Sequence, residues 1–156
     1  MKKADVLIRK GTTSDVAATL QLINELAIYE REPDAVVVTE EELREDGFGQ
    51  NPLYGLLVAE VDQVVVGISL YYYRYSTWKG KCLYLEDLIV TETQRGKGIG
   101  QQLFEATLSI AREENCRKMN WQVLDWNEPA IGFYKKYNAH LDDEWINGSI
   151  DIKLNQ

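Results

Sequence analysis

The chain contains little of several residue types, and each scarcity argues against a class of protein. Among its 156 residues are only two cysteines, Cys82 and Cys116, and one histidine, His140. Two cysteines form no disulfide framework, so we expect both to be small buried apolar residues in a reducing cytosol. A single histidine leaves no multi-histidine metal site and argues against a Ser-His-Asp hydrolase. The sequence therefore predicts a protein without a bound metal.

Positive charge is also scarce, since 17 lysines and arginines stand against 25 acidic residues and the formal net charge is −8. This balance argues against a nucleic-acid partner, because binding to phosphates needs a basic surface. Apolar runs such as 56–59 are too short to cross a membrane, and the N-terminus has no signal-peptide core. We expect one soluble, cytoplasmic domain over residues 1–156, because two domains would leave neither half a sufficient core.

Hydrophobic patterning predicts strands that alternate with helices. The runs with strand character, rich in β-branched and aromatic residues, are 6–8, 54–61, 64–75, 82–90, 119–123 and 144–154. Only Asp62-Gln63 separates the second run from the third, which predicts a hairpin. Together with the helices the order is βααβββαβαβ. This order predicts an α/β fold in which helices cover the faces of a mixed sheet.

The expected helices begin at recognisable caps. Ser14 or Asp15 can cap the first helix. The second begins at the capping box that Thr39 forms with Glu42, and Gly47 is its expected end. The remaining two helices are expected from residue 99 onward and over 129–137.

The most informative segment is the glycine-rich turn at 95–101, which follows the strand at 82–90 and opens a helix. It reads Arg95-Gly96-Lys97-Gly98-Ile99-Gly100-Gln101. Glycines let backbone N–H groups line a concavity without side chains in the way, and the helix N-terminus adds partial positive charge. Arg95 and Lys97 reinforce that sign. The turn therefore predicts a site for an anion such as a pyrophosphate.

Two common phosphate loops do not fit this turn. A Walker loop needs Gly-Lys-Ser/Thr, but Lys97 is followed by Gly98. The dinucleotide fingerprint needs a glycine where Gln101 stands, and it belongs to a first βαβ unit. What fits is Arg-x-x-Gly-x-Gly, at Arg95, Gly98 and Gly100. The alternative is a tight strand-to-helix connection without a ligand.

With this pattern the sequence resembles the GCN5-related N-acetyltransferases (GNAT), whose acetyl-coenzyme A loop carries it. The resemblance extends over nearly the whole chain to the diamine (spermidine/spermine) acetyltransferase branch. The matching segments are Tyr29-Glu30 and residues 45–49, 57–60, 84–87, 95–100, 126–129 and 133–135. The family implies a mixed, mostly antiparallel sheet with splayed central strands flanked by helices. It also implies acetyl-CoA as co-substrate and a homodimer.

The resemblance implies a cofactor site made largely of main-chain groups. The pantetheine arm can pair with the strand edge near Leu88 to Val90, where a backbone N–H can meet the oxyanion. Asn127, just before the last predicted helix, is an expected cap that can also bind the pantetheine amide. The implied cofactor-binding set is Leu88, Ile89, Val90, Arg95, Gly96, Lys97, Gly98, Ile99, Gly100, Gln101, Asn127, Ala130 and Tyr134.

Acetyl transfer to an amine requires that the amine lose a proton. An alkyl amine has a pKa of about 10.4, so almost none is nucleophilic at neutral pH. Glu86 is the candidate catalytic base, acting directly or through water. Strand alternation predicts that Glu86 shares a face with Tyr84, Leu88 and Val90, and that Asp87 points to the other side. The alternative is a solvated or salt-bridged carboxylate.

The departing thiolate needs a weak acid nearby, and Tyr134 occupies the position of the family's catalytic tyrosine. A phenol, with a pKa of about 10, can donate a proton or a hydrogen bond to sulfur. Only the family position distinguishes it from Tyr137, and an ordinary interfacial tyrosine is the alternative. Neither cysteine has a sequence-near histidine or basic pair that argues for a thiolate nucleophile. We therefore expect direct attack in a ternary complex.

Acidic residues concentrate in the segment 25–46, which carries a net charge of −7 out of the total of −8. They form either solvated helix faces or a surface that steers cationic amines. The resemblance implies an acceptor site at the positions Tyr29, Glu30, Ser76, Glu86, Asn120, Trp121 and Gln122.

Ser76 departs from the polyamine-acetylating members of the branch, which carry an aspartate there. The segments 76–80 and 123–127 look more like the sister group that acetylates thialysine and related aminoethyl amino acids. We expect an acetyltransferase for the primary amine of a diamine, polyamine or thialysine-like amino acid, with the long polyamine least favoured. The alternatives are a protein or peptide N-acetyltransferase and a non-catalytic acyl-CoA-binding module, which would need neither Glu86 nor Tyr134.

Overall fold

The computed structural model describes residues 5–154. The chain forms two compact units, Met1–Gln122 and Val123–Gln156. No helix within the described range is long and apolar enough to cross a membrane.

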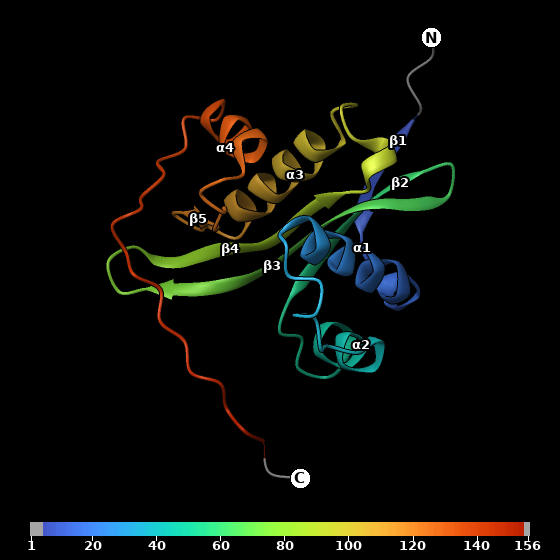
Figure 1. Ribbon diagram of the computed structural model, residues 1–156, viewed down its shortest axis with the longest axis horizontal. Coiled ribbons are helices and arrows are strands. Elements are labelled where there is room, and N and C mark those ends of the chain that lie inside the picture. Colours follow the sequence, from blue (N-terminus) through green and yellow to red (C-terminus); the bar gives the residue numbers. More distant parts are fainter. Residues whose placement is uncertain (1–4, 155–156) are drawn as a thin grey trace. The chain divides into compact units, whose positions relative to one another are not determined.

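The first unit is built on a sheet with the strand order β1-β2-β3-β4-β5 (Figure 1). Its strands are β1 (Val6–Lys10), β2 (Gly55–Val61), β3 (Val64–Ser76), β4 (Gly80–Val90) and β5 (Met119–Asn120). The first four are antiparallel neighbours, whereas β5 runs parallel to β4. This mixed, mostly antiparallel sheet confirms the predicted fold class.

Two helices cover opposite faces of this sheet. Leu22 of α1 (Val16–Tyr29) packs in one apolar cluster with Ile68 and Leu70 of β3. Thr107 of α3 (Ile99–Glu113) instead contacts Ser69, with 2.7 Å between the two hydroxyl oxygens. Successive residues of a strand point to opposite faces, so α1 and α3 lie on different sides of β3. The two faces are called the α1 face and the α3 face below.

The second helix, α2 (Glu40–Phe48), begins as predicted, because the Glu42 N–H donates to Thr39 Oγ1 at 3.1 Å. The prediction that it ends at Gly47 was wrong. The helix continues to Phe48, and the Gly49 N–H donates to the Glu45 carbonyl at 2.9 Å. A Cβ at Gly47 would collide with the Tyr54 ring. Glycine at this position therefore allows close packing and does not terminate the helix.

The hairpin between β2 and β3 is confirmed, with Asp62 and Gln63 at φ values of 49° and 64°. Two left-handed residues in a row match the twist of antiparallel strands. The strand predicted over 119–123 is shorter than expected. Only Leu83 and Tyr84 of β4 have partners on β5, so the two strands separate after Asn120.

The second unit contains α4 (Glu128–Lys135), whose cap was predicted. Asn127 Oδ1 accepts a hydrogen bond from the Ala130 N–H at 3.3 Å. The strand predicted over 144–154 was wrong, since none forms there. Its large apolar side chains are 74–96% exposed; they are Trp145, Ile146, Ile150, Ile152 and Leu154. Alternating apolar residues make a strand only where the backbone finds a ladder partner, and none of the described strands supplies one.

Candidate active site

The glycine-rich loop between β4 and α3 has the backbone geometry of an anion site. Gly96 and Gly98 have φ values of 78° and 79°, which glycine adopts without strain. A Cβ built on either residue meets nothing within 4 Å, so the space outside the loop is open. Gly98 caps α3, and the first N–H groups of a helix have no partner within it. These open N–H groups, with the helix dipole behind them, fit a pyrophosphate.

The Arg95 side chain is held by the protein itself. Its Nε donates to the Val90 carbonyl at 2.9 Å, and its Nη2 lies 3.6 Å from Glu25 Oε1. Its guanidinium carbon lies 5.3 Å from the centre of the Tyr29 ring. Lys97 Nζ likewise donates to Gln94 Oε1 at 2.9 Å. Arg95 thus ties the loop to β4 and α1, and a cofactor contact for either cation stays a prediction.

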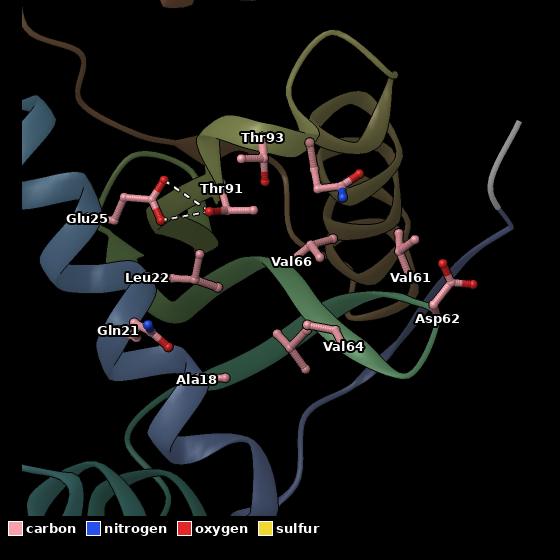
Figure 2. Close-up of a pocket in the computed structure, with 12 residues that line it drawn as sticks. Ala18, Gln21, Leu22, Glu25, Val61, Asp62, Val64, Val66, Thr91 and Thr93 are labelled. Carbon is pink, nitrogen blue, oxygen red and sulfur yellow. Dashed lines mark hydrogen bonds between the residues drawn. The ribbon is translucent and has the colours of Figure 1, made fainter.

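Glu25 anchors the same loop from α1, a role that the sequence did not reveal. Thr91 Oγ1 donates to the two carboxylate oxygens of Glu25 at 3.2 and 3.0 Å (Figure 2). The Glu92 N–H also donates to Glu25, at 2.9 Å. The partners lie 66 and 67 positions apart in the chain. Sequence separation of this size gives no pattern from which the contact could be predicted.

A cavity of about 400 Å³ opens beside this anchor, between α1, the β2–β3 hairpin and the segment 91–94 (Figure 2). Apolar residues such as Leu22, Val64 and Val66 form part of its wall. None of the predicted acceptor residues lines it. The cavity therefore lies behind the loop and apart from the residues that carry the predicted chemistry.

The edge of β4 beyond Tyr84 is free of β5. The Thr91 N–H donates to Val66 of β3 at 2.8 Å, whereas the Val90 carbonyl points away from β3 and accepts from Arg95. Backbone groups of alternate residues point to the same side of a strand. The N–H groups of Leu88 and Val90 therefore face the gap between the splayed strands, where an added chain can pair with them.

A β-bulge on β4 changes the direction of its carboxylates. Asp87 is opposite Leu70, but the next pair is Leu85 with Tyr71, so Glu86 has no partner on β3. Paired residues point to the same face, which places Asp87 with Leu70 on the α1 face. Tyr72, two residues after Leu70, is on the α1 face too.

Glu86 also lies on the α1 face, because the Tyr72 hydroxyl donates to its Oε2 at 3.4 Å. The prediction that Glu86 and Asp87 point to opposite sides was therefore wrong. Leu88 is paired with Ser69 on the α3 face, so Glu86 does not share a face with Leu88. Simple alternation fails here because the bulge inserts one residue into the strand.

The bulge brings together three acidic side chains, Glu30, Glu86 and Asp87, which we call the carboxylate cluster. Burial raises the pKa of Asp87 to about 7, and the charges of Glu86 and Glu30 add to the effect. Burial also raises the pKa of Glu30, again with a contribution from Glu86. Glu30 directly follows Tyr29, the last residue of α1. The fold thus joins two predicted acceptor residues and adds Asp87, which sequence reasoning had directed elsewhere.

One predicted acceptor residue of the first unit, Ser76, lies apart from this cluster. Ser76 is at the β3–β4 turn, where its Oγ accepts from the N–H groups of Trp78 and Lys79 at 3.2 and 3.1 Å. Ser76 is opposite Gly80 of β4. Gly80 is six residues before Glu86, so Ser76 and Glu86 are roughly 20 Å apart along the strand.

The segment 120–122 begins at Asn120, the last residue of β5. Asn120 is opposite Tyr84, and the Trp121 ring packs edge-on against Phe104 with 5.5 Å between centroids. The ring of Trp121 is therefore part of the packing around α3, and an acceptor contact for 120–122 stays a prediction.

In the second unit, α4 carries the remaining predicted residues. Asn127 caps the helix, Ala130 donates to that cap, and Tyr134 lies one turn further along. The Tyr134 ring is 5.4 Å from that of Phe133. Their cofactor and catalytic roles stay predictions.

The described residues contain no group of three or more histidine, cysteine or acidic side chains that could hold a metal ion. Cys82 is buried, as expected, whereas Cys116 is half-buried, and both are free. Burial raises the pKa of the Cys116 thiol, which disfavours the thiolate form.

Comparison with known proteins defines the class to which this fold and site belong. The sequence model of the Acetyltransferase (GNAT) family matches residues 19–139, so the chain belongs to this family. A thialysine N-epsilon-acetyltransferase from Bos taurus is 43% identical over 144 residues, which cover 87% of this chain and 85% of that protein. The chain is an N-acetyltransferase.

Two further comparisons concern the sequence and the fold. A spermidine/spermine N(1)-acetyltransferase-like protein 1 from Homo sapiens is 39% identical over 85% of this chain and 20% of that protein. The solved structure of the aminoglycoside N-acetyltransferase AAC(6')-Iy in complex with CoA aligns with a TM-score of 0.77. It covers 97% of this chain and 98% of that chain at 16% identity, which establishes a common fold.

Proposed function

We propose that the protein transfers an acetyl group from acetyl-CoA to the primary amine of a small cationic molecule. The acceptor is a thialysine-like amino acid or a short diamine, and transfer is direct within a ternary complex. The observation that carries this proposal is the carboxylate cluster on the α1 face of β4, beside the splayed edge. The names of the thialysine-acetylating relatives support the acceptor class.

The carboxylate cluster suits both binding and deprotonation of an ammonium group. Three acidic side chains attract the cation, and burial strengthens that attraction. Because burial raises the pKa of Asp87 to about 7, a proton can be taken up near neutral pH. Glu86, the exposed member, takes the proton from the amine directly or through water. Asp87 and Glu30 are coupled to Glu86 electrostatically, so the three carboxylates titrate together.

The loop and strand edge provide the complementary half of the site. Acetyl-CoA, when bound, supplies the acetyl thioester. The N–H groups of residues 98–101 hold its pyrophosphate, and the free edge at Leu88 and Val90 pairs with the pantetheine arm. An N–H group of that edge stabilises the developing oxyanion. The CoA complex among structures of the same fold is consistent with this donor.

For three residues of α4, in the second unit, we propose the roles that the family position implies. Asn127 and Ala130 contact the cofactor, and the Tyr134 phenol donates a proton or a hydrogen bond to the departing sulfur. These roles are carried over from the family position, and the cap geometry at Asn127 supports the expected start of the helix.

The direct test is release of free thiol from acetyl-CoA in the presence of an amine panel. The panel should contain S-(2-aminoethyl)-L-cysteine, short diamines, spermidine and a lysine peptide. We expect turnover with the small amines and a large loss in Glu86→Gln. Turnover with the peptide alone would favour a protein acetyltransferase, and cofactor binding without any turnover would favour a non-catalytic module.

We also propose that residues 1–156 work as one cytoplasmic domain that assembles as a homodimer. The family match spans both compact units, which supports a single functional domain. The exposed apolar residues between 145 and 154 support assembly, because such side chains gain from burial against a partner. Light scattering during size-exclusion chromatography should give twice the chain mass, and a monomer at micromolar concentration would contradict the proposal.

A further inference from the structure

Arg74 is an exposed cation on the α1 face of β3, two residues beyond Tyr72. Its guanidinium carbon lies 5.4 Å from the centre of the Tyr84 ring, and the rings of Tyr72 and Tyr84 stack at 5.2 Å. No carboxylate among residues 5–154 lies within ion-pair distance of Arg74. The guanidinium therefore has donors available for an external anion.

Arg74 and the carboxylate cluster lie at two ends of one aromatic surface. The guanidinium is level with Tyr84, and Glu86 follows two residues later on the same strand, which corresponds to roughly 7 Å. Between them are the stacked rings, one of which donates to Glu86 through the Tyr72 hydroxyl. The face thus has negative charge at one end, a flat apolar middle and positive charge at the other end.

We propose that Arg74 binds the carboxylate of an amino-acid acceptor whose terminal amine enters the carboxylate cluster. The inference rests on the proposed function and narrows its acceptor class to amino acids with an amine at the end of a short side chain. A guanidinium and a carboxylate can form two parallel hydrogen bonds, which fixes orientation as well as position. The intervening methylene and thioether groups would lie along the tyrosine rings.

The same geometry disfavours acceptors that lack a carboxylate. A diamine with its first amine at the cluster would place its second ammonium near Arg74, where like charges repel. Such repulsion discriminates between acceptors as effectively as a new attraction does. Arg74 would therefore determine specificity without taking part in the chemical step.

The test uses two acceptors that differ only in the carboxylate, S-(2-aminoethyl)-L-cysteine and bis(2-aminoethyl) sulfide. Thiol release is measured at saturating acetyl-CoA for the wild type, Arg74→Gln, Arg74→Lys and the control Arg112→Gln, which removes an exposed arginine near the end of α3. We expect Arg74→Gln to lower kcat/KM for the amino acid by about 10–100-fold, through KM, while the diamine is unaffected or improved. Arg74→Lys should recover part of the loss because it keeps the charge without the paired donors.

A substrate-side measurement keeps the test valid if Arg74→Gln does not fold. The carboxamide of the same amino acid should be poorer than the acid with the unchanged protein, by a similar factor. Equal losses for both acceptors in Arg74→Gln, or an amide as good as the acid, would overturn the role of Arg74. A wild type that acetylates neither acceptor would instead contradict the proposed function, and the assignment of Arg74 with it.

Discussion

Two proposed parts of the site are built in opposite ways: the glycine-rich loop for the cofactor, and the acceptor face, which is the carboxylate cluster with Tyr72, Tyr84 and Arg74. The loop is one continuous stretch, 95–101, and its geometry depends on backbone groups and on glycines that leave the space outside open. The acceptor face combines side chains of β3 and β4 with Glu30, the residue after α1, and a bulge directs two of them. A backbone site can therefore be shared by a whole family, whereas a site made of distant side chains can change its ligand by a few substitutions.

The largest effect is expected at the loop. Gly98→Asp places a negative charge and a side chain at a left-handed position in front of the N–H groups of α3. We expect acetyl-CoA affinity to fall at least about 1,000-fold, because the new carboxylate repels the pyrophosphate that the helix dipole attracts. Isothermal titration calorimetry with acetyl-CoA measures this loss.

Gly98→Asn is the matched control, because asparagine has nearly the same shape, tolerates the left-handed conformation and carries no charge. It should bind far more tightly than Gly98→Asp. Unchanged affinity in a folded Gly98→Asp protein would show that the pyrophosphate does not bind at this loop.

The next effect tests α4. Tyr134→Phe removes one hydroxyl and keeps the ring, so its packing against Phe133 should persist. If the phenol protonates the departing sulfur, turnover should fall about 10²–10⁴-fold with little change in acetyl-CoA affinity. Tyr137→Phe is the control. A Tyr134→Phe enzyme that keeps most of its turnover, with chemistry shown to be rate-limiting, would remove Tyr134 from the mechanism.

The sequence predicts the loop and most of the fold for a physical reason, since both depend on local signals. Glycine spacing specifies the loop, the Thr39–Glu42 capping box begins α2, and the two-residue Asp62-Gln63 connection closes a hairpin. Each of these signals acts within a few residues. The helix cap at Asn127 is also a local signal, and it was predicted correctly.

Non-local features could not be predicted in this way. The bulge at Glu86 depends on the register of β3 against β4, and no residue type in the strand predicts it. The anchor from Glu25 to Thr91 depends on packing between α1 and the end of β4. Gly47 was misassigned because its role is to make room for Tyr54. The strand expected over 144–154 has the right pattern, but strand formation requires a partner as well.

The third prediction concerns Asp87, the buried carboxylate of the acceptor face. Burial raises the pKa of Asp87 to about 7 from an ordinary value of 3.8, so the folded state binds an extra proton between these pH values. The free energy of unfolding should therefore fall as pH rises from about 4 to 7. Asp87→Asn removes this cost, and at pH 8 it should raise the free energy of unfolding by about 1–3 kcal/mol. Urea denaturation at pH 5 and pH 8 measures the difference.

Asp87→Asn should lower the acetyltransferase activity although it raises the free energy of unfolding. Without the Asp87 carboxylate, kcat/KM at pH 7 should fall roughly 10–100-fold. In the wild type, ionisation of Asp87 should make kcat/KM rise with pH around 7, and this rise should be absent from the variant. A variant that gains stability at high pH but keeps the activity profile would show that Asp87 is a buried charge without a part in deprotonation.

The smallest effect is expected at Ser76, the last residue of β3 before the β3–β4 turn. Its Oγ accepts two backbone hydrogen bonds, and an aspartate can accept the same bonds, so Ser76→Asp should fold normally. Ser76 is roughly 20 Å along the strand from Glu86, whereas extended spermidine spans only roughly 11 Å, so a carboxylate at position 76 can attract the polyamine but cannot bind it while its terminal amine is at Glu86. Ser76→Asp should therefore improve kcat/KM for spermidine by only about two- to threefold, through long-range attraction, and leave S-(2-aminoethyl)-L-cysteine unchanged. Ser76→Asn keeps the turn bonds without the charge and is the control, and low salt should enlarge the gain because the site is partly exposed. If the wild type already prefers spermidine and the substitution changes nothing, the carboxylate cluster alone determines the acceptor and Ser76 only shapes the turn.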